Sequence, residues 1–281
     1  MLVTKELNNN NFKIGQKTYV IAEIGINHGG SISVAKELID SAARTGVDAV
    51  KFQTYLTEKR APENNKEIFD ILKKCELPFQ DFTELKEHAD KLGIDFFSTA
   101  FDEESVDFLD DLGCEIFKIA SFDVTNHNLL RRVAKTNKTV ILSVGMSNIE
   151  EITEAYKILN KGSSKVILLH CVSAYPTREQ DANLGAIQAL KQRFDCVVGQ
   201  SDHTNDIFVP LCAVAAGAQV IEKHFKIDER MECVDSPVSI TEKQTREMVS
   251  QIRRIEEIFG TGHVSSTPAQ KPTEVFRRFS K

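Results

Sequence analysis

The chain has 281 residues, of which 41% are hydrophobic and 27% charged, a balance typical of a globular protein with a large core. Its formal net charge of -6 argues against nucleic acid or another polyanion as a partner. No apolar run reaches the roughly 18 residues that span a bilayer, and the polar, Asn-rich residues 1–11 are not typical of a signal peptide. We therefore expect a cytoplasmic protein with no membrane partner.

The six cysteines show neither a Cys-x-x-Cys pair nor the spacing of a zinc finger. Four of them, Cys114, Cys171, Cys196 and Cys212, lie inside apolar runs. Buried free thiols in a reducing compartment fit this pattern best, which agrees with a cytoplasmic location.

The chain opens with two β-type runs, 12–14 and 18–21, on either side of Gly15-Gln16, which predicts an N-terminal hairpin. A repeated order of apolar run, polar turn and amphipathic stretch then begins. The apolar runs predict strands near 19–26, 48–54, 95–100, 116–121, 139–144, 165–171, 196–201 and 220–225. The amphipathic stretches predict helices at 34–45, 82–92, 104–112, 129–135, 149–159, 186–193, 208–216 and 242–259, with an extra helix at 66–75.

Eight strands, each followed by a helix, predict a closed (β/α)8 TIM barrel, and their nearly continuous apolar character fits strands covered on both faces. We expect three parts: an N-terminal hairpin or extension at 1–18, the barrel at 19–260 and a linker-like arm at 261–281. Residues 56–78 form one long βα excursion, which on a barrel would lie over the active face.

His203 and His224 each stand at the end of a short β-branched or aromatic run, with a helix-like stretch between the two runs. If the runs are neighbouring parallel strands, both imidazoles emerge at the same end of the sheet. Such a pair makes a rigid half-site for a divalent transition metal and leaves other positions for water or substrate. Either histidine alone is as readily an ordinary strand-end residue, but the spacing of the pair favours a metal.

Polar residues also stand at the predicted carboxyl end of every strand. Lys51 and Lys118 are the most informative, because a lysine buried without an anion costs several kcal/mol. They predict a ligand with more than one negative group. Lys118 is expected to hold a phosphate together with the hydroxyls of Thr99, Ser121, Ser143 and Ser201, while Lys51 pairs with a carboxylate. Phosphoenolpyruvate carries both groups, although each serine alone could be a satisfied strand-end hydroxyl.

The motifs around these residues resemble the N-acetylneuraminate (sialic acid) synthase family, which includes the legionaminate, pseudaminate and spore-coat polysaccharide synthases. The resemblance extends in order from about residue 12 to about residue 278. It rests on Ala22-Glu23-Ile24-Gly25-Ile26-Asn27-His28, Lys51-Phe52-Gln53, Ser98-Thr99-Ala100-Phe101-Asp102, Ile141-Leu142-Ser143-Val144-Gly145-Met146, Leu169-His170-Cys171, Tyr175-Pro176, Ser201-Asp202-His203-Thr204 and Glu222-Lys223-His224-Phe225.

The resemblance implies roles for these positions. His203 and His224 match the family's metal ligands, usually to manganese, with Mg²⁺ or Co²⁺ as alternatives, and Glu23 matches the acidic residue beside the metal-bound water. Lys51 matches the contact to the phosphoenolpyruvate carboxylate. The phosphate contacts match Thr99, Lys118, Ser121, Ser143 and Ser201, and the contacts to the amino sugar match Gln53, Tyr175 and Asp235.

Three positions depart from the family pattern. Phe122 and Asp123 replace a glycine and a glutamate on the sugar side, and Ser173, a further expected phosphoenolpyruvate contact, replaces an asparagine. Full-length members continue past an Arg-Arg linker into an antifreeze-like domain, which lends an arginine to the partner's active site. Arg277-Arg278 resembles that linker, after which the chain ends. A barrel-only natural member and an excised domain both fit this ending.

The implied reaction is a metal-dependent condensation of phosphoenolpyruvate with the aldehyde of an N-acylated hexosamine, giving a nine-carbon 2-keto sugar acid and phosphate. By the same resemblance we expect a homo-oligomer, in particular a dimer. Two alternatives stay open: a phosphoenolpyruvate-condensing barrel that uses an aldose phosphate, and a barrel that binds a partner without turnover. His28, His170, Asp202 and Lys223 are expected to support the site or to pack.

Overall fold

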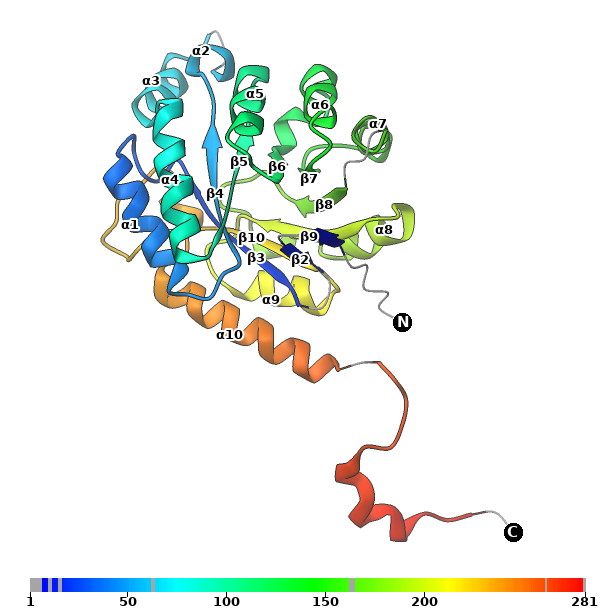
Figure 1. The fold of residues 1–281 in the computed structure, drawn as a ribbon. Coiled ribbons are helices and arrows are strands. Elements are labelled where there is room, and N and C mark those ends of the chain that lie inside the picture. Colours follow the sequence, from blue (N-terminus) through cyan, green and yellow to red (C-terminus); the bar gives the residue numbers. More distant parts are fainter. Residues whose placement is uncertain are drawn as a thin grey trace.

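The computed structural model describes residues 7–9, 12–14, 17–61, 64–161, 165–260 and 262–279. Within this part of the chain, eight parallel strands close into one barrel, because the last strand pairs with the first (Figure 1). The strands are β3 (Tyr19–Gly25), β4 (Ala49–Thr54), β5 (Asp95–Ala100), β6 (Ile116–Ile119), β7 (Thr139–Ser143), β8 (Val166–Cys171), β9 (Val197–Asp202) and β10 (Val220–His224). The predicted (β/α)8 barrel is confirmed.

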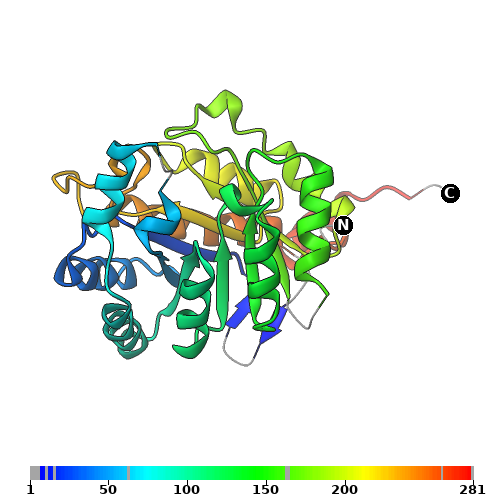
Figure 2. The same ribbon diagram turned by 90° about the horizontal axis from the view of Figure 1, so that it is seen from above.

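Helices alternate with the strands and surround them (Figure 2). They are α1 (Ile32–Ala43), α2 (Thr57–Arg60), α3 (Lys66–Cys75), α4 (Phe79–Leu92), α5 (Glu103–Asp111), α6 (His127–Ala134), α7 (Ile149–Leu159), α8 (Gly185–Arg193), α9 (Phe208–Ala215) and α10 (Glu242–Phe259). Short 3-10 turns are η1 (Ser121–Asp123), η2 (Glu179–Asp181), η3 (Ser236–Val238) and η4 (Pro268–Phe276). Ser31, Asp102 and Asn148 cap α1, α5 and α7 through their side chains. None of the helices in the described ranges is long and apolar enough to cross a bilayer.

The N-terminal hairpin exists, but its predicted pairing is wrong. Strand β2 (Phe12–Ile14) pairs antiparallel with β1 (Leu7–Asn9), outside the barrel wall, and Gly15 and Gln16 lie outside the described residues (Figure 2). Residues from Tyr19 onward belong to β3, which is buried along its whole length and paired on both edges, to β10 and β4. A strand with both edges occupied has no backbone groups left for a hairpin partner.

Inside the barrel, an apolar layer lies below the polar strand ends. It consists of Tyr19, Ile21, Ala49, Phe97, Ile116, Ile141, Ile167, Leu169, Val197 and Val220. Side chains two positions apart point to the same face of a strand. Glu23, Lys51, Lys118 and Ser143 each follow a member of this layer by two positions, so they also point into the barrel, one layer nearer its carboxyl end.

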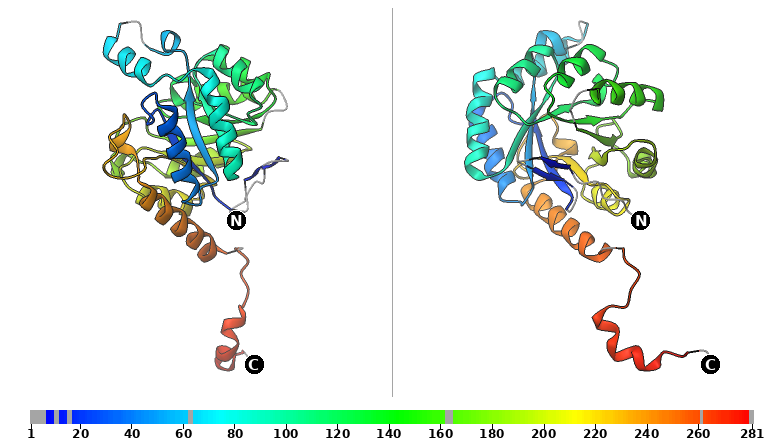
Figure 3. Two further views of the ribbon diagram at one scale, coloured as in Figure 1. Left: turned by 60° about the vertical axis from the view of Figure 1, so that its left-hand side comes forward. Right: turned by 45° about the vertical axis from the view of Figure 1, so that its right-hand side comes forward.

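Outside the barrel interior, a larger apolar core lies between the strands and the helices. All six cysteines are free thiols; Cys212 and Cys233 are partly exposed and the other four are buried. Beyond α10, η4 lies away from the barrel, and Val275 and Phe276 on it are exposed (Figure 3).

Candidate active site

A cavity of about 210 Å³ opens among the carboxyl ends of the barrel strands. Its volume is below the roughly 300 Å³ at which sites for drug-sized ligands begin, which suits a compact ligand. The residues predicted from the sequence that line it are Glu23, Lys51, Gln53, Thr99, Lys118, Ser121, Ser143, Tyr175, Ser201, His203, His224 and Asp235. The structure therefore brings side chains from all eight strands, or the loops that follow them, to one place.

Two predicted residues lie beside the cavity rather than in its wall. The Ser173 Oγ is 2.9 Å from the Ser121 Oγ, and Ser173 lines a neighbouring cavity of about 570 Å³ between β7, β8 and α8. The Asp123 carboxylate accepts a hydrogen bond of 2.9 Å from Asn126, the residue that caps α6. Ser173 reaches the site through Ser121, whereas Asp123 is engaged at the start of a helix.

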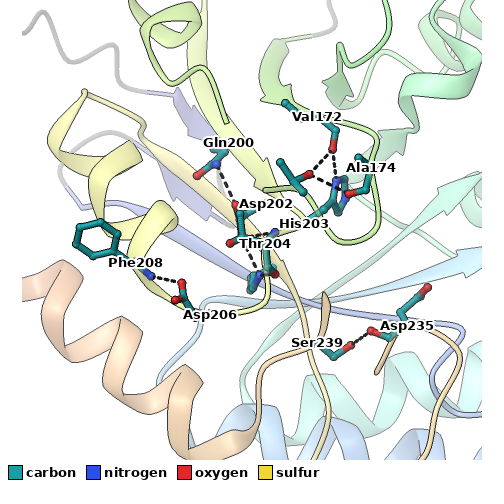
Figure 4. Close-up of polar contacts among 12 residues, drawn as sticks. Val172, Ala174, Gln200, Asp202, His203, Thr204, Asp206, Phe208, Asp235 and Ser239 are labelled. Atoms are coloured by element: carbon teal, nitrogen blue, oxygen red, sulfur yellow. Dashed lines mark hydrogen bonds and ion pairs between the residues drawn. The ribbon is translucent and has the colours of Figure 1, made fainter. Parts of the chain in front are cut away.

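The two histidines meet as the spacing predicts, with ring centroids 5.5 Å apart. The His203 Nδ1 lies 2.8 Å from the Val172 carbonyl oxygen (Figure 4). The His224 Nδ1 lies 3.4 Å from an Asp235 carboxylate oxygen. Metal-binding histidines usually direct one ring nitrogen at a carbonyl or carboxylate in this way, leaving the other for the ion.

The surroundings shift the pKa values of the two histidines in opposite directions. Burial, reinforced by His224, lowers the pKa of His203 to about 3, so this imidazole is neutral. Burial opposes the charged form of His224 as well, but the Asp235 carboxylate outweighs it and raises the pKa, so a metal ion would compete with a proton for this imidazole. The described ranges contain no group of three or more histidine, cysteine or acidic side chains arranged to hold a metal. The two imidazoles, with their ring centroids 5.5 Å apart, fit an ion whose other positions are left to water or substrate.

A buried ion pair fixes the loop that carries His203. The Asp202 carboxylate lies 2.7 Å from the Lys223 Nζ and accepts a 2.6 Å hydrogen bond from the Thr204 hydroxyl. It also accepts from Gln200 at 3.2 Å (Figure 4), and Lys223 donates to the Thr204 carbonyl as well. Asp202 and Lys223 therefore support the residues on either side of His203, as expected for residues that hold the site without entering it.

Both interior lysines have carboxylate partners, so the premise that they lack an anion is wrong. The Lys51 Nζ lies 2.8 Å from a Glu23 oxygen and 3.6 Å from a Glu222 oxygen, and the Lys118 Nζ lies 3.9 Å from the other Glu222 oxygen. Burial opposes ionisation of Glu222, but the two lysines outweigh it and lower its pKa to about 2. Glu222, which the sequence places at a strand end without assigning a role, is the shared counter-charge.

One hydroxyl without a partner and one lysine remain at this end of the cavity. The Ser143 hydroxyl is buried and has no hydrogen-bond partner among the described residues. Lys118 donates to the carbonyl of its neighbour Ile119 at 3.0 Å, and burial lowers its pKa. Buried donors normally have acceptors, so this corner can receive an oxygen-rich group.

Three polar side chains meet on the other side of the cavity. The Gln53 amide nitrogen donates to Glu23 at 3.1 Å. A Cβ at Gly25 would lie 3.1–3.4 Å from atoms of Glu23, Gln53 and Asp235, so only glycine leaves this point free. Burial raises the pKa of Glu23. The ring of Tyr175 lies beside them, 4.2 Å from that of His203 between centroids.

The cavity wall also contains residues to which the sequence assigns no role, namely Ile26, Arg60, Phe101, Ala120 and Cys171, and Glu222, which it places only at a strand end. Phe122, expected on the sugar side, lines the cavity as well. Arg60 lies in α2, inside the 56–78 segment that was expected to cover the active face. That expectation was the available signal, but the segment carries several charged residues, and only the fold shows which one turns inward.

Known proteins resemble this chain over most of its length. The NeuB family model matches residues 38–264. The chain is 42% identical to the N,N'-diacetyllegionaminic acid synthase of Campylobacter jejuni, over 94% of this chain and 84% of that protein. It is 32% identical to the N-acetylneuraminate-9-phosphate synthase of Mus musculus, over 86% and 71%.

Among solved structures, the N-acetylneuraminic acid synthetase of Leptospira borgpetersenii, in complex with citrate, superposes with a TM-score of 0.94. It shares 40% identity and covers 98% of this chain and 96% of that one. A truncated 3-deoxy-D-arabino-heptulosonate 7-phosphate synthase of Thermotoga maritima, at 18% identity, shares the fold alone. The chain therefore belongs to the NeuB family, whose matched members are named as sialic, legionaminic and pseudaminic acid synthases.

Proposed function

We propose that this protein condenses phosphoenolpyruvate with the open-chain aldehyde of an N-acylated hexosamine, giving a nine-carbon 2-keto sugar acid and phosphate. The observation that carries the proposal is one compact cavity that is lined both by the His203–His224 pair and by Lys51 and Lys118. Family membership supports the same reaction class.

The phosphate corner is assigned to Lys118, Ser143, Ser121, Thr99 and Ser201. The unpartnered Ser143 hydroxyl and the Lys118 ammonium would hold the phosphate as it becomes a leaving group. Lys51 would bind the carboxylate, exchanging part of its contact with Glu23 or Glu222 for the substrate. Ser173 would position the Ser121 hydroxyl to which it is hydrogen-bonded.

The acceptor side is assigned to Gln53, Tyr175 and Asp235, with Asp123 beside them. In the reaction, C3 of phosphoenolpyruvate bonds to the aldehyde carbon, water adds to C2, and the C2–O bond to phosphate breaks. A divalent metal ion held by His203 and His224, with Mn²⁺ as the first choice, would supply Lewis acidity toward the aldehyde oxygen. Glu23 would exchange the proton of the attacking water, which its raised pKa suits.

The test is phosphate release from phosphoenolpyruvate and N-acetylmannosamine after chelation and after Mn²⁺ is restored. We expect activity only when both substrates and the metal are present, and none in His203→Ala or His224→Ala. His127→Ala, a change to a partly exposed helix residue, should leave the rate unchanged. Release that survives chelation, or that occurs only with an aldose phosphate, would refute the proposal.

A further inference from the structure

The Arg60 side chain lies in the cavity wall and contacts two aromatic rings. Arg60 ends the short helix α2, and its guanidinium carbon lies 4.4 Å from the centroid of the Tyr55 ring and 3.8 Å from that of Phe101. The two rings are arranged edge to face, and the Tyr55 hydroxyl donates to the Leu72 carbonyl in α3 at 2.9 Å. Cation–π contacts to two rings, one of them anchored through its hydroxyl, fix the direction of the guanidinium.

The two rings contact the guanidinium, but they offer no hydrogen-bond acceptor to its Nη1 atom. The Nη1 atom is buried and has no hydrogen-bond partner among the described residues. Arginine remains charged at any physiological pH, and a buried charged donor without an acceptor is costly. Because Arg60 also lines the cavity, a ligand oxygen is the natural acceptor.

The acidic residues around Arg60 favour an uncharged ligand oxygen over a phosphate oxygen. Asp235, Glu23 and Asp123 are close enough to act on Arg60 electrostatically, so a phosphate here would face three carboxylates as well as one cation. The anionic groups of phosphoenolpyruvate are already assigned to Lys51 and Lys118. An uncharged carbonyl oxygen accepts from Nη1 without that repulsion. Ile26 and Phe101, which belong to the same apolar cluster as Tyr55, line the cavity and can contact a methyl group.

We propose that Arg60 is a specificity residue for the acceptor: its Nη1 donates a hydrogen bond to the carbonyl oxygen of the acylamino group, while Ile26 and Phe101 contact the acyl methyl. The inference rests on the proposed function and adds to it the residue that distinguishes an acylated amino sugar from a plain one.

The experiment compares Arg60→Met and Arg60→Lys with Lys59→Met, a control on the same helix whose side chain pairs with Glu104 at the surface. Acceptors are N-acetylmannosamine, N-acetylmannosamine 6-phosphate and mannose, and thermal melting checks the fold. In Arg60→Met we expect the KM for N-acetylmannosamine to rise about 10- to 100-fold, the range for loss of a charged hydrogen bond. The preference over mannose should fall by a similar factor. The KM for phosphoenolpyruvate should stay within about twofold. Arg60→Lys keeps the charge but not the planar guanidinium, so its KM for N-acetylmannosamine should lie between those of wild type and Arg60→Met. If Arg60→Met does not fold, Arg60→Lys provides the test.

Each result separates the two proposals. If wild type turns over N-acetylmannosamine and neither Arg60 variant changes its KM or the preference over mannose, the role of Arg60 is refuted while the proposed function stands. An equal rise in both substrates' KM values would refute it too, as would a wild-type preference for the 6-phosphate that Arg60→Met removes. If wild type releases no phosphate with any N-acylated hexosamine, the proposed function fails and the inference fails with it.

Discussion

Removing Lys223 should destabilise the barrel more than removing any surface lysine. The Lys223 and Asp202 side chains are 1% and 2% exposed and lie 2.7 Å apart. Lys223→Met would leave the Asp202 carboxylate buried with only the Thr204 and Gln200 donors. Breaking one side of a buried ion pair costs about 3–5 kcal/mol. For a chain of this size that corresponds to a fall in melting temperature of about 6–10 °C, taking about 2 °C per kcal/mol.

The assay is urea and thermal unfolding of Lys223→Met, Asp202→Asn and the double variant, with Lys86→Met as control. Lys86 forms an exposed pair with Asp90, so its loss should cost less than about 1 kcal/mol. The double variant should be more stable than Lys223→Met, since it removes the uncompensated charge. Equal losses for Lys223→Met and Lys86→Met, or fully additive losses in the double variant, would refute a coupled buried pair.

Three further predictions concern the strand packing, a buried histidine and the lysine counter-charge. Gly199→Ala should lower the free energy of unfolding by about 3 kcal/mol, because the new Cβ would lie 2.2 Å from the Val220 carbonyl oxygen, a backbone atom with little freedom to move. Gly185→Ala, whose Cβ meets nothing within 4 Å, is the control, and equal urea midpoints for the two variants would contradict the clash. Burial lowers the pKa of His28 from 6.5 to about 4, so the unfolded chain binds a proton more readily than the folded chain, and stability falls as pH drops below 6.5. Between pH 7.5 and 5 the free energy of unfolding should fall by about 2 kcal/mol. His28→Leu should remove this loss, and an identical pH profile of stability in both proteins would contradict the prediction. Glu222→Gln leaves Lys118 and Lys51 with less counter-charge, so inorganic phosphate should raise the melting temperature of this variant more than that of wild type; an equal or smaller rise would count against a phosphate site at these lysines.

The strands could be predicted closely because each contains an apolar run that is covered on both faces. For β5 and the helices α3, α7 and α10 the predicted and observed bounds coincide. The hairpin failed because residues 12–14 and 18–21 have the same local pattern, and only closure of the barrel decides that Tyr19 belongs to the wall. Short helices such as α2 carry too few residues to show a period.

Much of the site could also be predicted, since a period of two places Glu23, Lys51, Lys118 and Ser143 on the interior face of their strands. The sequence could not predict which charged side chains pair with one another. Glu222 shares a strand with His224 and accepts a hydrogen bond from Ser201 on the neighbouring β9. Its ion pairs, however, are with Lys51 and Lys118, which come from β4 and β6. Pairing of side chains across a barrel depends on the stagger between strands and on side-chain length and conformation. The residue spacing within one strand determines neither the stagger nor the conformation.

The charges in the cavity wall nearly cancel among themselves, and this changes which features point to a ligand. Lys51, Lys118 and Arg60 face Glu23, Glu222 and Asp235, so interior lysines alone do not require an anionic ligand; the protein already supplies carboxylates. What it does not supply is an acceptor for the Ser143 hydroxyl and for the Arg60 Nη1, both buried without partners among the described residues. These two donors lie in the walls assigned to the phosphate and to the acceptor sugar. Because an unsatisfied donor is costly whatever the net charge, they are stronger evidence for two ligand groups in this cavity than the lysines are.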